Sequence, residues 1–197
     1  MMDLQPAARQ LAELVNEVPD NHLTAPTPCE QMTMGDLVHH IDGLARAFTA
    51  AATKDLGPET SRAPLSDGSQ LGGDWRSRIP DQLEALAEAW RNPAAWDGMT
   101  QAGGADLPGE MAGKVALDEL VVHGWDLALA SGRAYDIDRQ TIEACLELVA
   151  VLSPPEQRTG GDGLFERAVG MPADAPLLDR LIALTGRDPT WTPPTGS

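Results

Sequence analysis

Residues 117–127 read LDELVVHGWDL, and this stretch bears on both the fold class and the candidate chemistry of the chain. On a helix that advances about 100° per residue, Leu120 and Leu127 define one apolar face, and His123 falls within it. Valine, tryptophan and leucine side chains make the other faces apolar as well. Because a helix that is apolar all round is buried, the sequence predicts a central helix over about residues 110–130.

Two further side chains are predicted to point toward His123. Glu119 lies four residues before His123 at the edge of the same face, and side chains at this spacing stack on neighbouring turns. A second helix is predicted over about residues 33–53, and its apolar stripe places His40 inward and His39 outward. A carboxylate buried beside imidazoles is costly unless something compensates, and a divalent cation held by His40, Glu119 and His123 would do so. The alternative is a hydrogen-bonded Glu119–His123 pair, with His40 as a packed core residue.

The sequence leaves the roles of two neighbouring residues open. Asp126, one turn beyond His123, is either a carboxylate that orients a ligand or a solvated or tryptophan-adjacent group. Cys29, just before the second helix, is either a fourth ligand or nucleophile with a lowered pKa, or a small buried residue of the connector. Asp118 is expected at the surface and Cys145 in the core.

The rest of the sequence predicts a mostly α protein. Apolar residues recur at helical spacing in four further segments, which Gly, Pro, Ser and Asp interrupt. Pro80 falls inside one segment, so that helix is expected to begin at Asp74 or only near the proline. We therefore expect helices over about residues 4–18, 74–91, 138–152 and 175–185, loops over 54–73 and 99–109, a Gly-rich stretch after Pro154-Pro155, and a short strand or extended segment over 165–171.

We expect these elements to form a single structural unit, since 197 residues suffice for one domain with a sizeable core. Residues 1–152 are predicted to form a metal-binding helical bundle. Residues 153–197 are predicted to form a C-terminal extension with one helix packed on that bundle.

The composition argues against several classes of function. Fourteen Lys and Arg face 30 Asp and Glu, a formal net charge of −16 with no basic stripe, which disfavours nucleic acids and anionic membranes as partners. No apolar run reaches the roughly 18–20 residues of a membrane span, and the first residues do not resemble a secretory signal. A cytoplasmic location with reduced thiols is therefore expected, since two cysteines are too few for a disulfide scaffold.

The segments that hold the candidate ligands resemble a known family. PTPC at 26–29 with TMGDLVHH at 33–40, and DELVVHGWDLA at 118–128, are similar to the two metal motifs of the mycothiol-dependent maleylpyruvate isomerase metal-binding domains. Within it, the chain looks closest to a branch of largely uncharacterised actinobacterial metal-binding proteins, and GRDPTW at 186–191 fits the same resemblance. The family usually reads Cys-Pro-Gly-Trp-Thr-Val where this chain has CEQMTM at 29–34, so the entrance to the site differs.

This resemblance implies a DinB-like four-helix bundle with an added C-terminal segment. It assigns metal ligation to the positions of His40, Glu119 and His123, with zinc as the first candidate and nickel as the second. It also implies mycothiol as a thiol cofactor. The partners would then be this small-molecule thiol and a small electrophilic substrate, and a homodimer stays open.

Three functions are compatible with such a site. In an isomerase or thiol S-transferase, the ion holds the cofactor sulfur as a thiolate that attacks an electrophile. In a metal-dependent hydrolase, the open position holds a water whose pKa is lowered toward about 7. In a non-enzymatic bundle the metal is structural or vestigial. An open position beside a pocket would favour the first two functions, and a fourth protein ligand such as Cys29 would favour the third.

Overall fold

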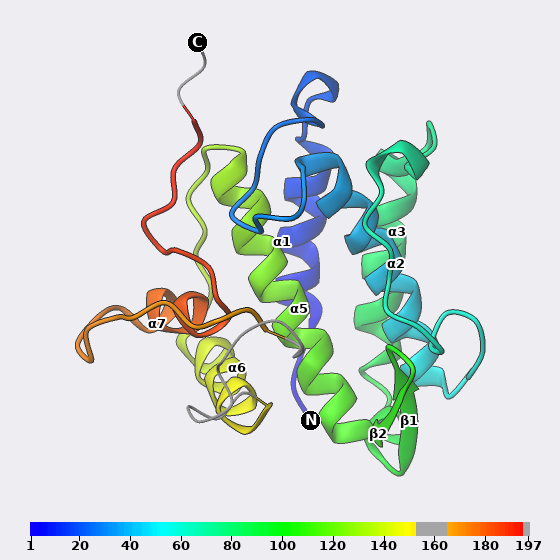
Figure 1. Cartoon of the computed structure of the whole chain (residues 1–197). Coiled ribbons are helices and arrows are strands. Elements are labelled where there is room, and N and C mark those ends of the chain that lie inside the picture. Colours follow the sequence, from blue (N-terminus) through cyan, green and yellow to red (C-terminus); the bar gives the residue numbers. More distant parts are fainter. Residues whose placement is uncertain (153–164, 195–197) are drawn as a thin grey trace.

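Four helices pack in a ring around a common core: α1 (Gln5–Asn16), α2 (Met34–Thr53), α3 (Trp75–Ala89) and α5 (Gly109–Ala130) (Figure 1). Helices α1 and α2 each contact both α3 and α5. The computed structural model describes residues 1–152 and 165–194. The predicted mostly α class and the four-helix bundle are thereby confirmed.

Helix α2 begins where the sequence predicts, because a capping box fixes its first turn. The Thr33 hydroxyl accepts a hydrogen bond from the Asp36 backbone N–H at 3.3 Å, and the Asp36 carboxylate accepts one from the Thr33 N–H at 3.0 Å. These bonds satisfy amide groups that a helix start would otherwise leave unpaired. Since the start of α2 is fixed, the side on which His40 lies is fixed as well.

Helix α5 is the buried centre of the fold, as its apolar sequence predicts. It packs against α1 and α2 on one side and against α6 (Arg139–Leu152) on another. Each fully buried Leu or Val side chain adds about 1.5–3 kcal/mol through removal from water. Although α5 is apolar on every face, neither it nor any other helix in the described part of the chain is long and apolar enough to cross a membrane.

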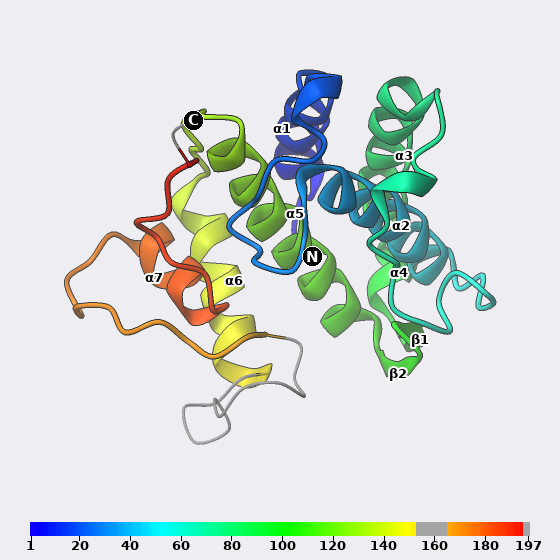
Figure 2. The same ribbon diagram turned by 45° about the horizontal axis from the view of Figure 1, so that its top comes forward.

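Two helices lie outside the ring, on the other side of α5 from α3 (Figures 1 and 2). Helix α6 packs against α5, and α7 (Leu177–Leu184) packs against α6. Ile182 of α7 is buried and packs with Val122 and Trp125 of α5. This contact brings the end of α7, and the residues that follow it, to the edge of the bundle core.

The prediction of a loop over residues 99–109 is wrong, because this segment forms a β-hairpin. Strands β1 (Met99–Ala102) and β2 (Ala105–Pro108) pair antiparallel, and a short helix α4 (Pro93–Trp96) precedes them. Gly103 and Gly104 both have positive φ, as a two-residue hairpin turn of type I′ requires. The glycines indicated a break in helical structure, but strands of four residues are too short to show a clear alternation.

The structure also decides where α3 begins and whether residues 165–171 form a strand. Helix α3 begins at Trp75 and contains Pro80, so the proline does not delay its start. Residues 165–171 form no strand; the Val169 N–H donates to the Ala183 carbonyl at 2.8 Å, which ties this extended segment to α7. The Gly-rich stretch predicted after Pro154-Pro155 lies outside the described residues.

Candidate metal centre

The fold brings together the three residues that the sequence singles out. His40 comes from α2, and Glu119 and His123 come from neighbouring turns of α5. One potential ligand atom of each lies within 4.8 Å of those of the other two. Nε2 of His123 is 3.1 Å from Oε2 of Glu119, and the two imidazole rings lie edge to face with centroids 5.0 Å apart. Ligand atoms of a tetrahedral zinc site are about 3.4 Å apart, so small side-chain movements would suffice to close the group around an ion.

A buried carboxylate orients one of the two imidazoles. Oδ2 of Asp126 lies 3.0 Å from Nδ1 of His123, and the Asp126 side chain is fully buried. With Nδ1 turned to Asp126, the other ring nitrogen faces Glu119. Carboxylates commonly hold metal-ligating histidines in this way. Of the two roles that the sequence leaves open for Asp126, the structure therefore favours the orienting one.

Arg187 compensates the charge of Asp126, and sequence reasoning did not identify this role. Its Nη2 donates to Oδ2 of Asp126 at 3.2 Å, and its Nε lies 3.4 Å from Oδ1. Its Nη1 donates to the Thr185 carbonyl at 3.1 Å. Arg187 follows α7, 61 residues from Asp126 along the chain, so helical spacing could not relate the two. The only indication was its place in the GRDPTW ending.

The pKa values of the two histidines are shifted in opposite directions. Burial lowers the pKa of His40 to about 4, and the neighbouring His123 acts in the same direction. Burial also disfavours the charged form of His123, but hydrogen bonds to Asp126 and Glu119 outweigh it and raise its pKa to about 9. Burial opposes ionisation of Glu119, yet its contact with His123 lowers its pKa overall. Without an ion, His123 and Arg187 therefore carry the two positive charges that balance the carboxylates of Glu119 and Asp126.

The residues present fit a divalent ion. His40 is neutral at physiological pH, and its buried Nδ1 has no hydrogen-bond partner. Glu119 is ionised, and only the proton of His123 must leave for both histidines to become ligands. Two imidazole nitrogens and one carboxylate oxygen form a donor set that suits zinc and also nickel.

A cavity of about 560 Å³ opens beside the three candidate ligands. His40, Glu119 and His123 line it, together with Arg187 and apolar side chains of α2, α5, the hairpin and the long loop after α2. Its size lies within the roughly 300–1,000 Å³ of small-molecule sites. A ligand in this cavity would reach the open position of an ion held by the three residues.

Cys29 lines the same cavity but does not have the properties of an activated thiol. It is half-buried and lies outside the group of candidate ligand atoms. Burial raises the pKa of its thiol, although Arg187 acts in the opposite direction. Of the two roles that the sequence leaves open for Cys29, the structure therefore favours the small connector residue over the ligand or activated nucleophile. Cys29 precedes the capping residue Thr33 by four positions and does not lie on the first turn.

The expectation that Asp118 lies at the surface is also wrong. The residue is only 2% exposed, because α6 covers this side of α5 and places Cys145 beside it. Burial raises the pKa of the Asp118 carboxyl to about 8, and its Oδ1 has no hydrogen-bond partner. Cys145 is buried, as predicted.

His39 serves the long loop that follows α2 rather than the candidate ligands. Its Nδ1 accepts a hydrogen bond from the Asp67 N–H at 3.1 Å, and the Asp36 carboxylate accepts one from the Gly68 N–H at 2.8 Å. Together these bonds fasten the loop across α2. The loop passes close to the helix, since a Cβ added at Gly43 would lie 2.8 Å from Pro64.

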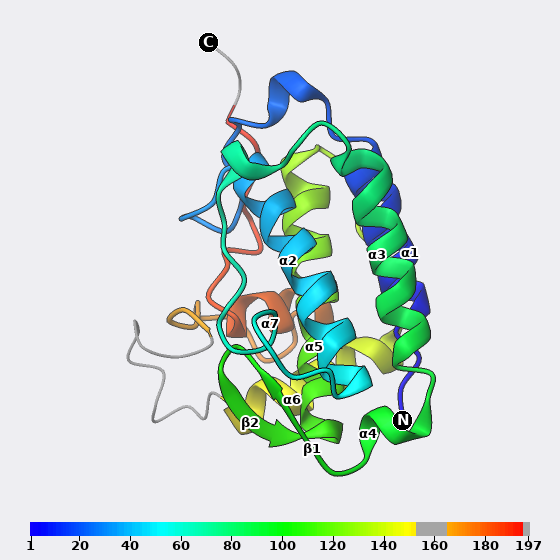
Figure 3. The same cartoon turned by 90° about the vertical axis from the view of Figure 1, so that its right-hand side faces the viewer.

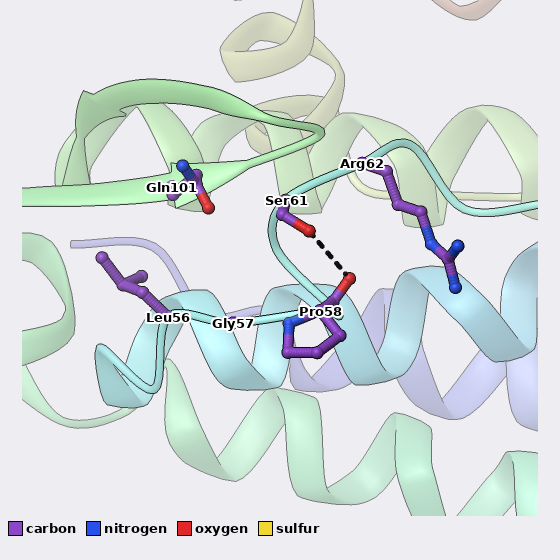
Figure 4. Close-up of a pocket in the computed structure, with 6 residues that line it drawn as sticks. All are labelled: Leu56, Gly57, Pro58, Ser61, Arg62 and Gln101. Atoms are coloured by element: carbon purple, nitrogen blue, oxygen red, sulfur yellow. Dashed lines mark hydrogen bonds between the residues drawn. The ribbon is translucent and has the colours of Figure 1, made fainter.

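A second hollow, of about 460 Å³, lies between this loop and the hairpin (Figure 4). Arg62 is the one charged residue among those that line it, and the Ser61 hydroxyl donates to the Pro58 carbonyl at 3.2 Å. None of the described lining residues is a histidine, cysteine or acid. We therefore assign no chemistry to this hollow.

Comparison with known proteins adds a family to this geometry. The family model described as "Mycothiol maleylpyruvate isomerase N-terminal domain" matches residues 4–128, which contain His40, Glu119, His123 and Asp126. Two proteins of Mycobacterium tuberculosis, from two strains and both named as uncharacterised, are 26% identical to the chain over 187 residues. The match covers 95% of this chain and 97% of each relative. No solved structure matches the chain significantly.

Proposed function

Because the chain belongs to the mycothiol maleylpyruvate isomerase N-terminal domain family, we propose that it is a divalent-metal-dependent enzyme that uses a small thiol of the mycothiol type. The reaction would be an isomerisation or an S-transfer on an electrophilic substrate. The observation that carries this proposal is the group formed by His40, Glu119 and His123 at the wall of a cavity. The DinB-like helical fold of the family agrees with the observed bundle.

In this proposal His40, Glu119 and His123 hold the ion, with zinc as the first candidate and nickel as the second. An ion in this site would lower the pKa of a thiol that reaches it and so keep the sulfur nucleophilic at neutral pH. Asp126 holds His123 in the orientation that ligation needs, and Arg187 keeps Asp126 ionised. Three protein ligands leave a position open for a further ligand.

Neither reaction needs a side chain of the protein to take a proton from the substrate. In S-transfer, the thiolate forms a bond to an electrophilic carbon while the leaving group departs with the bonding electrons, and the thiol proton passes to solvent. In isomerisation, the thiolate adds to a carbon–carbon double bond, rotation follows, and elimination restores the double bond and the thiolate. The thiolate does the bond-making in both cases.

Two alternatives have less support. A structural metal in a non-enzymatic bundle does not account for the cavity, and Cys29 does not complete the group of ligand atoms. A metal hydrolase would use the same ligands, but the family match favours a thiol over water. Of the C-terminal extension predicted over residues 153–197, the described residues 165–194 belong to the same unit in this proposal, since Arg187 contacts Asp126.

The metal test compares the two adjacent histidines of α2. We expect the wild type and His39→Ala to bind about one equivalent of zinc, and His40→Ala and His123→Ala to lose most of it. Equal loss in all three variants, or no metal in the wild type, would contradict the proposal. Titration of the cobalt-substituted protein with mycothiol or cysteine tests the thiol. A new sulfur-to-cobalt absorption band supports the thiol enzyme, and an unchanged spectrum argues against it.

A further inference from the structure

We propose that the cavity beside the three candidate ligands binds a small, uncharged, apolar electrophile and not a dicarboxylate. This inference rests on the proposed function and names its substrate class. It follows from the side chains that line the cavity and from the charges that face it. The cavity has a polar end, formed by the candidate ligands and Arg187, and an apolar body that extends away from them.

One wall of the apolar body belongs to α2. Leu44 follows His40 by one helical turn and Phe48 follows Leu44 by another, and all three line the cavity. Ala47 adds a small side chain between them. Two turns of helix span about 11 Å. The wall therefore offers apolar contacts over the length of a small organic molecule.

The facing wall belongs to α5, which runs opposite to α2 (Figure 3). Val115 precedes Glu119 by one turn, and Met111 precedes Val115 by another. Because the two helices are antiparallel and packed together, these residues extend in the same direction as the wall of α2. Both helices thus continue the cavity from the candidate ligands mainly with apolar side chains, although Asp118, next to Glu119 on α5, also lines it.

The hairpin and the long loop supply further apolar lining. Ala102 of β1 and Leu107 of β2 line the cavity, as does Pro64 of the loop. The hairpin is held in place by the Thr100 hydroxyl, which donates to the Ala51 carbonyl at 2.7 Å. A molecule in the cavity would therefore touch apolar groups from four separate elements.

The charges that face the cavity do not suit a dianion. Besides the histidines, Arg187 is the one cationic side chain among the described residues that line it. Its hydrogen bonds already go to Asp126 and to the Thr185 carbonyl. Glu166 faces the cavity with Glu119, and the whole chain carries a net charge of −16. The open position of an ion in the site could accept one carboxylate, but the described lining residues offer no free guanidinium or amine for the second, which would face Glu119 and Glu166.

The experiment titrates the zinc-loaded, full-length protein with N-phenyl-1-naphthylamine, a neutral two-ring fluorophore. We expect fluorescence to rise on binding and to fall when neutral 1-chloronaphthalene competes, whereas millimolar maleate leaves it unchanged. Displacement by maleate at lower concentration than by the neutral competitor would overturn the proposal. So would the absence of probe binding to protein that holds its zinc.

Variants locate the probe in the cavity. Val115→Phe fills the space between the walls, and Leu107→Asp places a charge on the half-buried hairpin wall; each should weaken probe binding by about tenfold or more. Val151→Phe makes the same volume change on α6, at a side chain that is 65% exposed, and should leave binding unchanged. Unaltered binding in both cavity variants would refute the assignment. If Val115→Phe fails to fold, Leu107→Asp alone still tests whether the probe binds in the cavity.

Zinc content is measured on every sample, so that a failure of the proposed function can be distinguished from a failure of the substrate class. Protein that lacks zinc contradicts the proposed function. Protein that holds zinc but binds maleate in preference to the neutral probe contradicts only the substrate class.

Discussion

Asp126 and His123 form a buried pair in which Oδ2 of the carboxylate lies 3.0 Å from Nδ1 of the ring. His123 lies one turn beyond Glu119 on the same helix and Asp126 lies almost one turn further, where Arg187 donates to its carboxylate. The orientation of His123 is therefore set before any ion binds.

Asp126→Asn should weaken metal binding by about 10–100-fold, because loss of a carboxylate behind a ligating histidine typically has this effect. The amide can keep the hydrogen bond but not the charge. Competition with a chelator measures the change in affinity. Asp81→Asn, at an exposed position of α3, is the matched control and should bind as the wild type does. Equal affinity in both variants would show that Asp126 has no part in the site.

Arg187→Ala should reduce metal affinity in the same direction and also destabilise the protein. It removes one of the two cationic partners of the buried Asp126 carboxylate, the other being His123, and removing one partner of a buried pair costs about 3–5 kcal/mol. The double variant Asp126→Asn with Arg187→Ala should therefore be more stable than Arg187→Ala alone. Urea unfolding of the three variants tests this, and simple additivity would contradict the coupling.

Metal binding should release about one proton near neutral pH, because His123 holds a proton up to a pKa of about 9 in the metal-free protein. The apparent affinity should rise about tenfold per pH unit until this pKa is reached. Calorimetry in two buffers with different ionisation enthalpies counts the proton directly. Affinity that does not change with pH would contradict the raised pKa.

The same shift has a consequence for the metal-free protein. The pKa of His123 is raised from 6.5 to about 9, so its contribution to the free energy of unfolding is complete below pH 6.5 and is lost as the pH rises through about 9. Urea unfolding across this range should show the loss in the wild type. His123→Gln should show a flatter profile.

Asp118→Asn should stabilise the protein by about 1–3 kcal/mol above neutral pH. Burial raises the pKa of this carboxyl from 3.8 to about 8, so the native state loses stability as the pH rises between these values. Asparagine cannot ionise and escapes that loss. The advantage should shrink at about pH 5, and an equal difference at both pH values would contradict the ionisation argument.

Much of the candidate site could be predicted because its residues are related by helical spacing. Glu119 and His123 are four positions apart on one helix, and the stripe of α2 distinguishes His40 from His39. The ligand role itself stays a prediction. Arg187 could not be found in this way, because its contact with Asp126 depends on how α7 docks on the bundle.

The errors have a common cause in tertiary packing. Asp118 is buried because α6 covers a side of α5 whose exposure no local pattern reveals. The hairpin at residues 99–108 depends on the turn at Gly103-Gly104 and on its attachment to α2 through Thr100. Its strands are too short to be recognised without that context.

The contact between Arg187 and Asp126 also bears on the order of events during synthesis. Helix α5 ends at Ala130, so the whole four-helix ring has been translated well before Arg187 is added to the chain. At about 5–20 residues per second, the ribosome needs several seconds to cover this interval. Until then the protonated His123 is the charged partner of Asp126, and the contacts that hold this carboxylate are completed only when α7 and Arg187 dock on the bundle.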